Sequence, residues 1–345
     1  MSPALPSLPG KRWPFRVRAP GKAILFGEHA VVRGRTALVL AVDRGTEIDF
    51  RPLPPGSRST WNGAPFDAEL NPYLREAMRR HPDWSARPVA LTVRSELPRA
   101  SGLGTSAAFT VALVAGFTLP DRQELPRAEV AEESYRIERA AQGVGSPVDT
   151  SASTAGGLLA IGTEPGEEEL WTLPAVDTSP PFHARRVHSP PWSWAAAFSG
   201  IAKATGPKVR AVGEVFATPE GAEILERIGR LSREGEGALD REDKDAVGAL
   251  MAENHQLLRS LGVSHPRLEA LLEVARPFVH GAKVTGAGGG GSVLALVREG
   301  QHEALRKAWA RAGGVPFLLS VAPQGLQVMT LGSALRDHAD HVPGL

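Results

Sequence analysis

The segment SGLGTSAA, from Ser101 to Ala108, has an order of residue types that suits phosphate binding. Glycines let a backbone approach a ligand closely, and a helix start after them would offer unpaired N–H groups and a positive dipole end. Thr105 and Ser106 would stand in the first helical turn, where a hydroxyl can cap the helix or bind a metal ion. An ordinary loop whose hydroxyl residues cap a core helix is the alternative. The motif GxxxxGK[ST] is absent, so the sequence predicts a nucleotide fold of another kind.

A second set of polar residues accompanies an expected early strand. Lys22 stands at the start of the apolar run 23–26, and Glu28 and His29 follow that run directly. The end of a strand is a suitable place for binding groups. A solvated lysine and a hydrogen-bonded turn histidine are the alternatives that the residue types leave open.

The third candidate is a glycine-rich stretch late in the chain, KVTGAGGGGSVLALV, at residues 283–297. It fits the dinucleotide pattern GxGxxG, but residues 292–297 read as a buried strand rather than the helix that such a site requires. The pattern therefore argues against NAD binding and leaves a close-packed glycine loop between two strands.

Two carboxylates could serve phosphoryl transfer, which requires a metal ion and a group that accepts the hydroxyl proton. Glu138 lies on the apolar stripe of an expected helix, where a carboxylate needs a partner such as a metal ion, an arginine or a hydroxyl. Asp149 follows the turn-like segment GVGSPV and could equally be a helix N-cap or a turn residue.

These segments together resemble the motifs of the GHMP kinase superfamily, in the same order along residues 19–297. PRASGLGTSAA is similar to its phosphate-binding motif PxxxGLGSSAA, with Thr105 in place of the first serine. APGKAILFGEHAVVRG is closest to the opening motif of the mevalonate kinase branch, and the late glycine loop is similar to the third motif. Gly145 precedes Pro147 here, whereas mevalonate kinases usually carry these two residues in the reverse order.

The resemblance implies a role for particular residues. Asp149 would accept the hydroxyl proton, and Lys22 would lie beside it. Ser106 and Glu138 would hold Mg²⁺, while Glu28, His29, Asp149 and, from the looser match SGIAKATGPKV, Lys203 and Thr205 would face the substrate. The residues expected at the ATP phosphates are Ser101, Gly102, Leu103, Gly104, Thr105, Ser106, Ala107, Gly286, Gly288 and Gly289.

The implied activity is ATP-dependent phosphorylation of the primary hydroxyl of mevalonate. Phosphomevalonate kinase, mevalonate diphosphate decarboxylase or another GHMP small-molecule kinase are the enzyme alternatives, and a non-catalytic nucleotide-binding regulator is an alternative of another class. Because family members are often dimers, the resemblance also implies a homodimer.

Composition agrees with this picture and excludes other classes. The chain has 345 residues, with 39 Lys plus Arg against 38 Asp plus Glu, so no general positive field would hold nucleic acid or an anionic membrane. It has no cysteine, which suits a reducing cytoplasm and excludes thiolate chemistry. The charge-free stretch 100–120 approaches the length of a membrane span, but its front third, SGLGT, favours a buried helix. Residues 1–15 have no continuous apolar core and are interpreted as a loose leader, not a secretory signal.

The elements that must position these groups are predicted from periodicity and turn residues. Strands are expected in residues 15–50, at 89–93, at 194–198, on both sides of 286–291 and at 326–331. Helices are expected after the loop at 101–106, at 126–142, at 208–216, through 225–261, at 266–274 and at 301–312. This mixture predicts an α+β fold. The resemblance implies an N-terminal domain like ribosomal protein S5 domain 2, placed at 1–185, and a ferredoxin-like C-terminal domain at 186–345.

Overall fold

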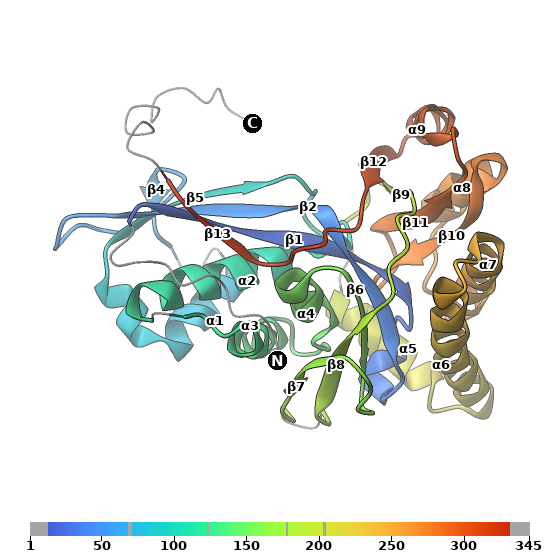
Figure 1. Ribbon diagram of the computed structural model, residues 1–345, viewed down its shortest axis with the longest axis horizontal. Coiled ribbons are helices and arrows are strands. Elements are labelled where there is room, and N and C mark those ends of the chain that lie inside the picture. The colour runs from blue at the N-terminus through green and yellow to red at the C-terminus, as the bar shows by residue number, and fades with distance from the viewer. Residues whose placement is uncertain (1–12, 68–70, 123, 177–178, 203–204, 332–345) are drawn as a thin grey trace.

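Two β-sheets and the helices packed on them make up the protein (Figure 1). The computed structural model describes residues 13–67, 71–122, 124–176, 179–202 and 205–331, with the side chains of Asp121 and Thr205 excepted. The larger sheet has nine strands in the order β4-β3-β5-β2-β6-β8-β7, with β1 pairing to both β2 and β13. These strands are β1 (Phe15–Phe26), β2 (Ala37–Pro52), β3 (Thr60–Trp61), β4 (Ala64–Pro65), β5 (Val89–Ser95), β6 (Leu158–Gly162), β7 (Glu169–Leu173), β8 (Phe182–Val187) and β13 (Gln327–Thr330).

Four helices lie along one face of this sheet: α1 (Pro72–Arg80), α2 (Thr105–Thr118), α3 (Arg127–Gln142) and α4 (Val148–Ala155) (Figure 1). Helix α2 is the central one, because it is apolar on all sides and eleven of its residues, from Ala107 to Phe117, are buried. Its Gly116 receives the ring of Phe50 from β2, where a side-chain carbon would lie 2.0 Å from the ring. The close approach of α2 to β1 and β2 fixes the glycine loop at the start of α2 against the sheet.

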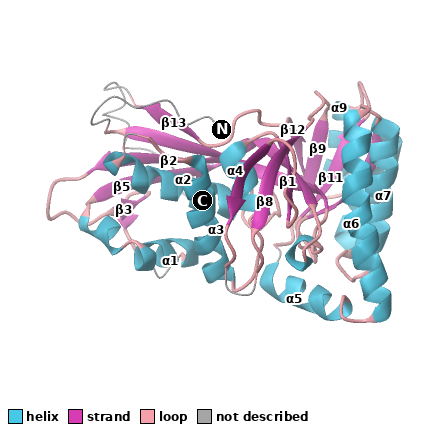
Figure 2. Cartoon of the chain, turned by 60° about the horizontal axis from the view of Figure 1, so that its bottom comes forward, coloured by secondary structure: helices cyan, strands magenta, loops and turns pink. Residues whose placement is uncertain are grey.

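The smaller sheet has the order β10-β11-β9-β12 and is antiparallel. Its strands are β9 (Trp194–Phe198), β10 (Val279–Thr285), β11 (Ser292–Val297) and β12 (Val315–Leu319). The helices of this half are α5 (Thr205–Val215), α6 (Pro219–Asp240), α7 (Lys244–Ser260), α8 (Pro266–Ala275) and α9 (His302–Arg311). Helices α6 and α7 stand side by side at the end of the molecule away from α1 (Figure 2).

Strand β1 passes from one environment to another along its length. In its first half, Phe15 and Val17 are buried while Arg16 and Arg18 are half-exposed; from Ala19 to Phe26 every residue is buried. The alternation of buried and half-exposed residues ends where helix α6 also packs on β1. Gly235 of α6 lies against the ring of Phe26. The second half of β1 is therefore enclosed between both halves of the protein, and it carries Lys22.

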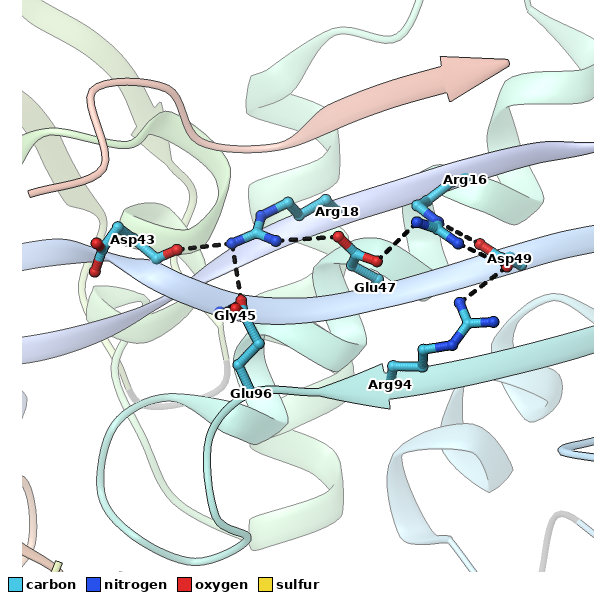
Figure 3. Close-up of polar contacts among 8 residues, drawn as sticks. All are labelled: Arg16, Arg18, Asp43, Gly45, Glu47, Asp49, Arg94 and Glu96. Atoms are coloured by element: carbon cyan, nitrogen blue, oxygen red, sulfur yellow. Dashed lines mark hydrogen bonds and ion pairs between the residues drawn. The ribbon is translucent and has the colours of Figure 1, made fainter. Parts of the chain in front are cut away.

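The face of the large sheet opposite α2 carries a ladder of alternating charges (Figure 3). Arg16 donates to both carboxylate oxygens of Asp49, at 2.5 and 3.0 Å, and Arg94 donates to the same carboxylate at 3.0 Å. Arg18 continues the row to Glu47 and Glu96. The side chain of Asp49 is only 3% exposed because the two guanidinium groups cover it. In β1 and β2 these residues alternate with buried core residues, so the ladder occupies the polar face of the strands.

Most of the expected elements are present with nearly the expected bounds, and β9 matches its predicted range of 194–198. Helix α2 lies within the charge-free stretch 100–120, and in the part of the chain that the structure describes no helix is long and apolar enough to cross a membrane. Helix α1 and strands β3, β4, β6, β7, β8 and β12 were not predicted. Asp149 lies in the first turn of helix α4, a helix that the sequence suggested only through the N-cap alternative.

The predicted boundary between residues 185 and 186 falls inside β8, which pairs with β6 and β7 in the large sheet. Strand β13, near the end of the chain, also joins the large sheet by pairing with β1. The division into 1–185 and 186–345 stays a prediction, and the large sheet draws strands from both of these ranges.

Candidate active site

Lys22 stands in the enclosed half of β1, directly against the glycine loop. Its backbone N–H donates to the carbonyl of Leu103 at 2.8 Å. A side-chain carbon at Gly104 would lie 2.7 Å from Cγ of Lys22, and Gly104 has a φ of 78°. Only glycine readily adopts this φ and also leaves room for the Lys22 side chain. Gly104 therefore lets the lysine side chain run beside the loop.

The ammonium group of Lys22 meets a carboxylate from the middle of the chain. Its Nζ lies 3.0 Å from Oδ2 of Asp149, which stands in the first turn of α4. The lysine side chain is 2% exposed and the aspartate 32% exposed, so the pair has a buried cation and a carboxylate that still reaches a cavity. The structure thus brings together the two residues to which the family resemblance assigns the reaction chemistry.

The first turn of α2 is open toward the same place. Its N-cap is Gly104, and no side chain caps it. The Thr105 hydroxyl donates instead to the carbonyl of Pro98 at 2.9 Å, which closes the loop behind it. Neither Thr105 nor Ser106 caps α2, so the structure does not have the capping arrangement that was the alternative. Uncapped N–H groups at a helix start form a favourable place for phosphate oxygens.

Ser106, Glu138 and Tyr73 form the next part of the site. Gln142 donates to the phenol oxygen of Tyr73 at 3.3 Å and to Oε1 of Glu138 at 3.4 Å. The Ser106 side chain also lies close to the Tyr73 hydroxyl. Burial, together with the charge of Glu138, raises the pKa of the phenol, so Tyr73 stays a neutral hydroxyl. Glu138 is 7% exposed, as its place on the apolar stripe predicted.

A cavity of about 580 Å³ begins at this loop. Five of the seven loop residues expected to bind nucleotide line it: Ser101, Gly102, Gly104, Thr105 and Ser106. Leu103 and Ala107 are fully buried and do not line it. Its apolar wall includes Trp61 and Phe109, whose rings stack with centroids 5.1 Å apart. The cavity therefore combines a polar, glycine-lined end with an aromatic wall.

A second, smaller cavity of about 90 Å³ lies on the other side of the aspartate. Lys22, Glu28, His29, Glu138, Arg139 and Gly286 are among its lining residues. Asp149 and Gln142 line both cavities. A carboxylate at the junction of two cavities can contact a group from each, which suits a transfer between two ligands.

The late glycine loop contributes mainly through its backbone. Gly286 lines the small cavity, and Ser292 after the loop donates to the carbonyl of Ser101 at 2.9 Å. Gly288 packs against the carbonyl of Val263, where a side-chain carbon would lie 2.1 Å away, and Gly289 donates to the same carbonyl at 2.7 Å. Neither Gly288 nor Gly289 lines the two cavities.

Glu28 and His29 follow β1, as predicted, but Glu28 makes an unexpected contact. Its carboxylate is buried in an ion pair with Lys283 of β10, while His29 lies with Nε2 3.2 Å from the carbonyl of Ala287. Lys203 and the side chain of Thr205 lie outside the described residues. Thr205 is the first residue of α5, and its neighbours Gly206 and Pro207 line the large cavity.

Sequence reasoning did not find Tyr73, Arg139 or Lys283. Asn71 accepts hydrogen bonds from the N–H groups of Tyr73 and Leu74, both at 3.0 Å, so the pair Asn71-Pro72 was a usable signal for the start of α1. Nothing local marks a tyrosine in that first turn as a site residue. Tyr73 joins the site only because α1 packs against α3, which carries Glu138 and Gln142.

Two family models match parts of this chain. The model of the GHMP kinases N terminal domain matches residues 72–157, and the model GHMP kinases C terminal matches residues 236–315. Mevalonate kinase of Thermococcus gammatolerans is 32% identical over 343 aligned residues, which cover 90% of this chain and 97% of that protein.

Solved structures have the same fold. The mevalonate kinase of Methanococcus jannaschii superposes with a TM-score of 0.73 at 25% identity, covering 91% of this chain and 99% of the other. The L. major mevalonate kinase in complex with R-mevalonate has a TM-score of 0.71 at 23% identity, covering 94% of this chain and 100% of the other. These comparisons confirm the predicted α+β, two-domain fold of the GHMP kinases.

Proposed function

Since this chain belongs to the GHMP kinase family of ATP-dependent small-molecule kinases, we propose that it is a mevalonate kinase. It would transfer the γ-phosphoryl group of ATP to the 5-hydroxyl of mevalonate and give 5-phosphomevalonate for isoprenoid synthesis. The observation that carries the proposal is the position of Asp149, which Lys22 holds at 3.0 Å and which lines both cavities. The phosphoryl donor would occupy the large cavity and the alcohol the small one.

In this proposal Asp149 accepts the proton of the 5-hydroxyl as the oxygen attacks the γ-phosphorus. A carboxylate at the mouth of both cavities can contact the hydroxyl while the phosphoryl group approaches from the other side. Lys22, buried on one side of Asp149, pairs with that carboxylate and adds positive charge where negative charge develops. The bond from the γ-phosphorus to the β-phosphate bridging oxygen breaks, and ADP leaves from the large cavity.

The nucleotide phosphates would rest on the loop at 101–106, against the uncapped N–H groups of α2. The stacked pair of Trp61 and Phe109 offers a flat apolar surface on which the base can lie. Both features line the same cavity of about 580 Å³, so one nucleotide can contact both.

Mg²⁺ fits the donor set beside the loop. Mg²⁺ bound to a nucleotide usually takes one or two carboxylates and the phosphates themselves, rather than a cage of protein ligands. Glu138 and Ser106 provide one carboxylate and one hydroxyl, and both lie near Tyr73. The described residues contain no group of three or more acidic, histidine or cysteine side chains that could hold a metal ion. Mg²⁺ that is bound together with a nucleotide does not need such a group. When bound, Mg²⁺ would neutralise phosphate charge.

The small cavity favours an acceptor with one negative group over an acceptor with two. Among the described residues that line it, the positively charged ones are Lys22 and Arg139. Lys22 pairs with Asp149. In this proposal the guanidinium of Arg139, which also donates to the carbonyl of Gly145 at 3.1 Å, binds the mevalonate carboxylate. A phosphorylated acceptor would need further cations. Arg33 and Lys208 instead contact the carbonyls of Gly213 and Gly262, and Arg99 lines the large cavity.

The direct test is ATP consumption measured in parallel with mevalonate, phosphomevalonate, homoserine and galactose, with Mg²⁺ present. The proposal expects turnover with mevalonate alone. Turnover with phosphomevalonate alone would overturn it in favour of the next kinase of the same fold. ATP binding without turnover of any of the four would instead support the non-catalytic regulator.

Two further expectations belong with this proposal. The homodimer that the family resemblance implies is tested by light scattering of the purified chain. The cytoplasmic location is tested by fractionation of cells that express it at its natural level.

A further inference from the structure

A buried ion pair that takes no part in the transfer lies at the wall of the small cavity. It joins Glu28, at the end of β1, to Lys283 of β10 in the smaller sheet. The two side chains are 1% and 0% exposed. The ammonium of Lys283 donates to Oε1 of Glu28 and to the carbonyl of Val284 at 2.7 Å, while Asn254 of α7 donates to Oε2 of Glu28 at 3.2 Å. Both carboxylate oxygens are therefore held by the C-terminal half of the chain.

Stability alone does not explain such a pair. Burial raises the pKa of the Glu28 carboxyl and lowers that of the Lys283 ammonium, so burial opposes the charge on both residues. A buried ion pair often stabilises a fold no better than apolar residues of similar volume, whereas it restricts the geometry of the groups it joins. The geometry around Glu28 is therefore the feature that the pair controls.

The turn after Glu28 has a conformation that needs external support. His29 has a φ of 61°, in the left-handed region that a residue with a side chain rarely adopts. The N–H of Ala30 donates to the carbonyl of Glu28 at 2.7 Å, and Nε2 of His29 lies 3.2 Å from the carbonyl of Ala287. Glu28, His29 and Ala287 all line the small cavity with Lys22 and Asp149. The turn is thus a wall of that cavity, and β10 fixes it from behind.

We propose that Lys283 is a positioning residue for the acceptor: through Glu28 it holds the His29 turn against Ala287 and so completes the small cavity. Glu28 lines the cavity but acts through the turn that it holds, and this turn is the part of the wall that meets the acceptor. The inference rests on the proposed function, because it takes the small cavity as the acceptor site. It separates the roles of the two cavities, since neither Glu28 nor Lys283 lines the large cavity.

The experiment compares Lys283→Met, Glu28→Gln and the double variant with Lys307→Met, a control in which an exposed lysine of α9 is changed in the same way. Asn254→Ala is a milder variant that removes only one donor to Glu28. KM for mevalonate, KM for ATP, kcat and the binding of a fluorescent ADP analogue are measured for each, together with the melting temperature.

We expect Lys283→Met and Glu28→Gln each to lower kcat/KM for mevalonate by about 10- to 100-fold, because a small displacement of positioning groups has effects of that size. ADP-analogue affinity should stay within about threefold of wild type, a shift below 1 kcal/mol. The double variant should be no worse than the poorer single variant, because both changes break one contact. Asn254→Ala should show a smaller loss of the same kind.

Three results would overturn the inference. One is a folded Lys283→Met protein with wild-type kcat/KM for mevalonate. Another is equal loss of nucleotide and acceptor affinity. The third is a defect in Glu28→Gln that Lys283→Met does not share, since this would make Glu28 a direct contact of the acceptor.

If Lys283→Met does not fold, unchanged acceptor kinetics in folded Asn254→Ala decides against the inference. If wild type consumes ATP with another of the four acceptors, the proposed function fails, and the same variants test the inference on that acceptor.

Discussion

Oδ2 of Asp149 lies 3.0 Å from Nζ of Lys22, although 127 positions separate the two residues in the chain. Two packing arrangements produce this contact. The glycine loop lies on β1 through the hydrogen bond from Lys22 to Leu103, and α4 packs on the same strand with its first turn toward the lysine. The lysine is buried and the aspartate half-exposed, so the pair has one open side. That side is the place where a donor and an acceptor can meet.

Replacing Asp149 by Asn tests the role of this open carboxylate. Asn keeps the size of the side chain but cannot accept a proton, so we expect kcat to fall about 10²- to 10⁴-fold. Binding of an ADP analogue should change little, because the loop and the aromatic wall are untouched. The control is Asp83→Asn, because Asp83 is exposed and far from Asp149 in the sequence. Parallel losses of turnover and nucleotide affinity would contradict the assigned role.

The Mg²⁺ dependence of turnover tests Glu138. We expect EDTA to abolish activity in wild type, and Glu138→Gln to require a several-fold higher Mg²⁺ concentration for half-maximal rate, since a neutral amide binds the cation more weakly. The measurement is the rate against free Mg²⁺ at fixed ATP. Glu132→Gln, on the outer side of the same helix, should have the wild-type dependence. An unchanged Mg²⁺ curve for Glu138→Gln would remove this residue from the metal site.

Arg139→Gln tests the contact with the acceptor carboxylate. Loss of a charge-assisted hydrogen bond of about 1.5–3 kcal/mol should raise KM for mevalonate about 10- to 100-fold and leave KM for ATP near its wild-type value. Arg136→Gln on the same helix is the matched control, because Arg136 pairs with Glu132 and does not line the cavity. A rise in both KM values would mean that Arg139 supports the loop through Gly145, whose carbonyl accepts its hydrogen bond at 3.1 Å.

The sequence predicted the parts of this site that depend on local pattern. The stripe on α3 predicted that Glu138 is buried, and the glycines at 102 and 104 predicted a loop with close backbone approach; both have positive φ values. The family resemblance then indicated which charges should meet. Without it, spacing alone could not predict that Lys22 and Asp149 are in contact, because their distance depends on how α4 packs against β1.

Other features depend on tertiary contacts that no local pattern encodes. Residues 162–192 contain many prolines and weak periodicity, yet β7 and β8 form there because β6 offers a paired edge. Strand β13 pairs with β1 from the other end of the described chain. Glu28 was predicted to face the acceptor, and its partner Lys283 is 255 positions away. Such pairings are set by the assembled sheets, so they are visible only in the structure.

The charge ladder on the large sheet makes a prediction about stability and pH. Burial alone would raise the pKa of Asp49, but hydrogen bonds from Arg16 and Arg94 outweigh it and hold this pKa below its ordinary value of 3.8. A carboxyl whose pKa is lower in the folded than in the unfolded chain adds stability above its unfolded pKa, which is about 3.9. That contribution is lost as the pH falls through the lower, folded pKa.

We therefore expect Asp49→Asn to reduce the free energy of unfolding by about 1–3 kcal/mol at pH 7, the size of a hydrogen-bonded charge contact. The difference from wild type should stay constant from pH 7 to about 5 and shrink below about pH 4, because wild type then loses the same contact by protonation. Urea unfolding at several pH values measures this, with Glu223→Gln on exposed α6 as the control. A difference that persists undiminished at pH 3 would mean that Asp49 acts through packing rather than charge. Kinetic constants at pH 7 should be unchanged, since Asp49 lines neither cavity.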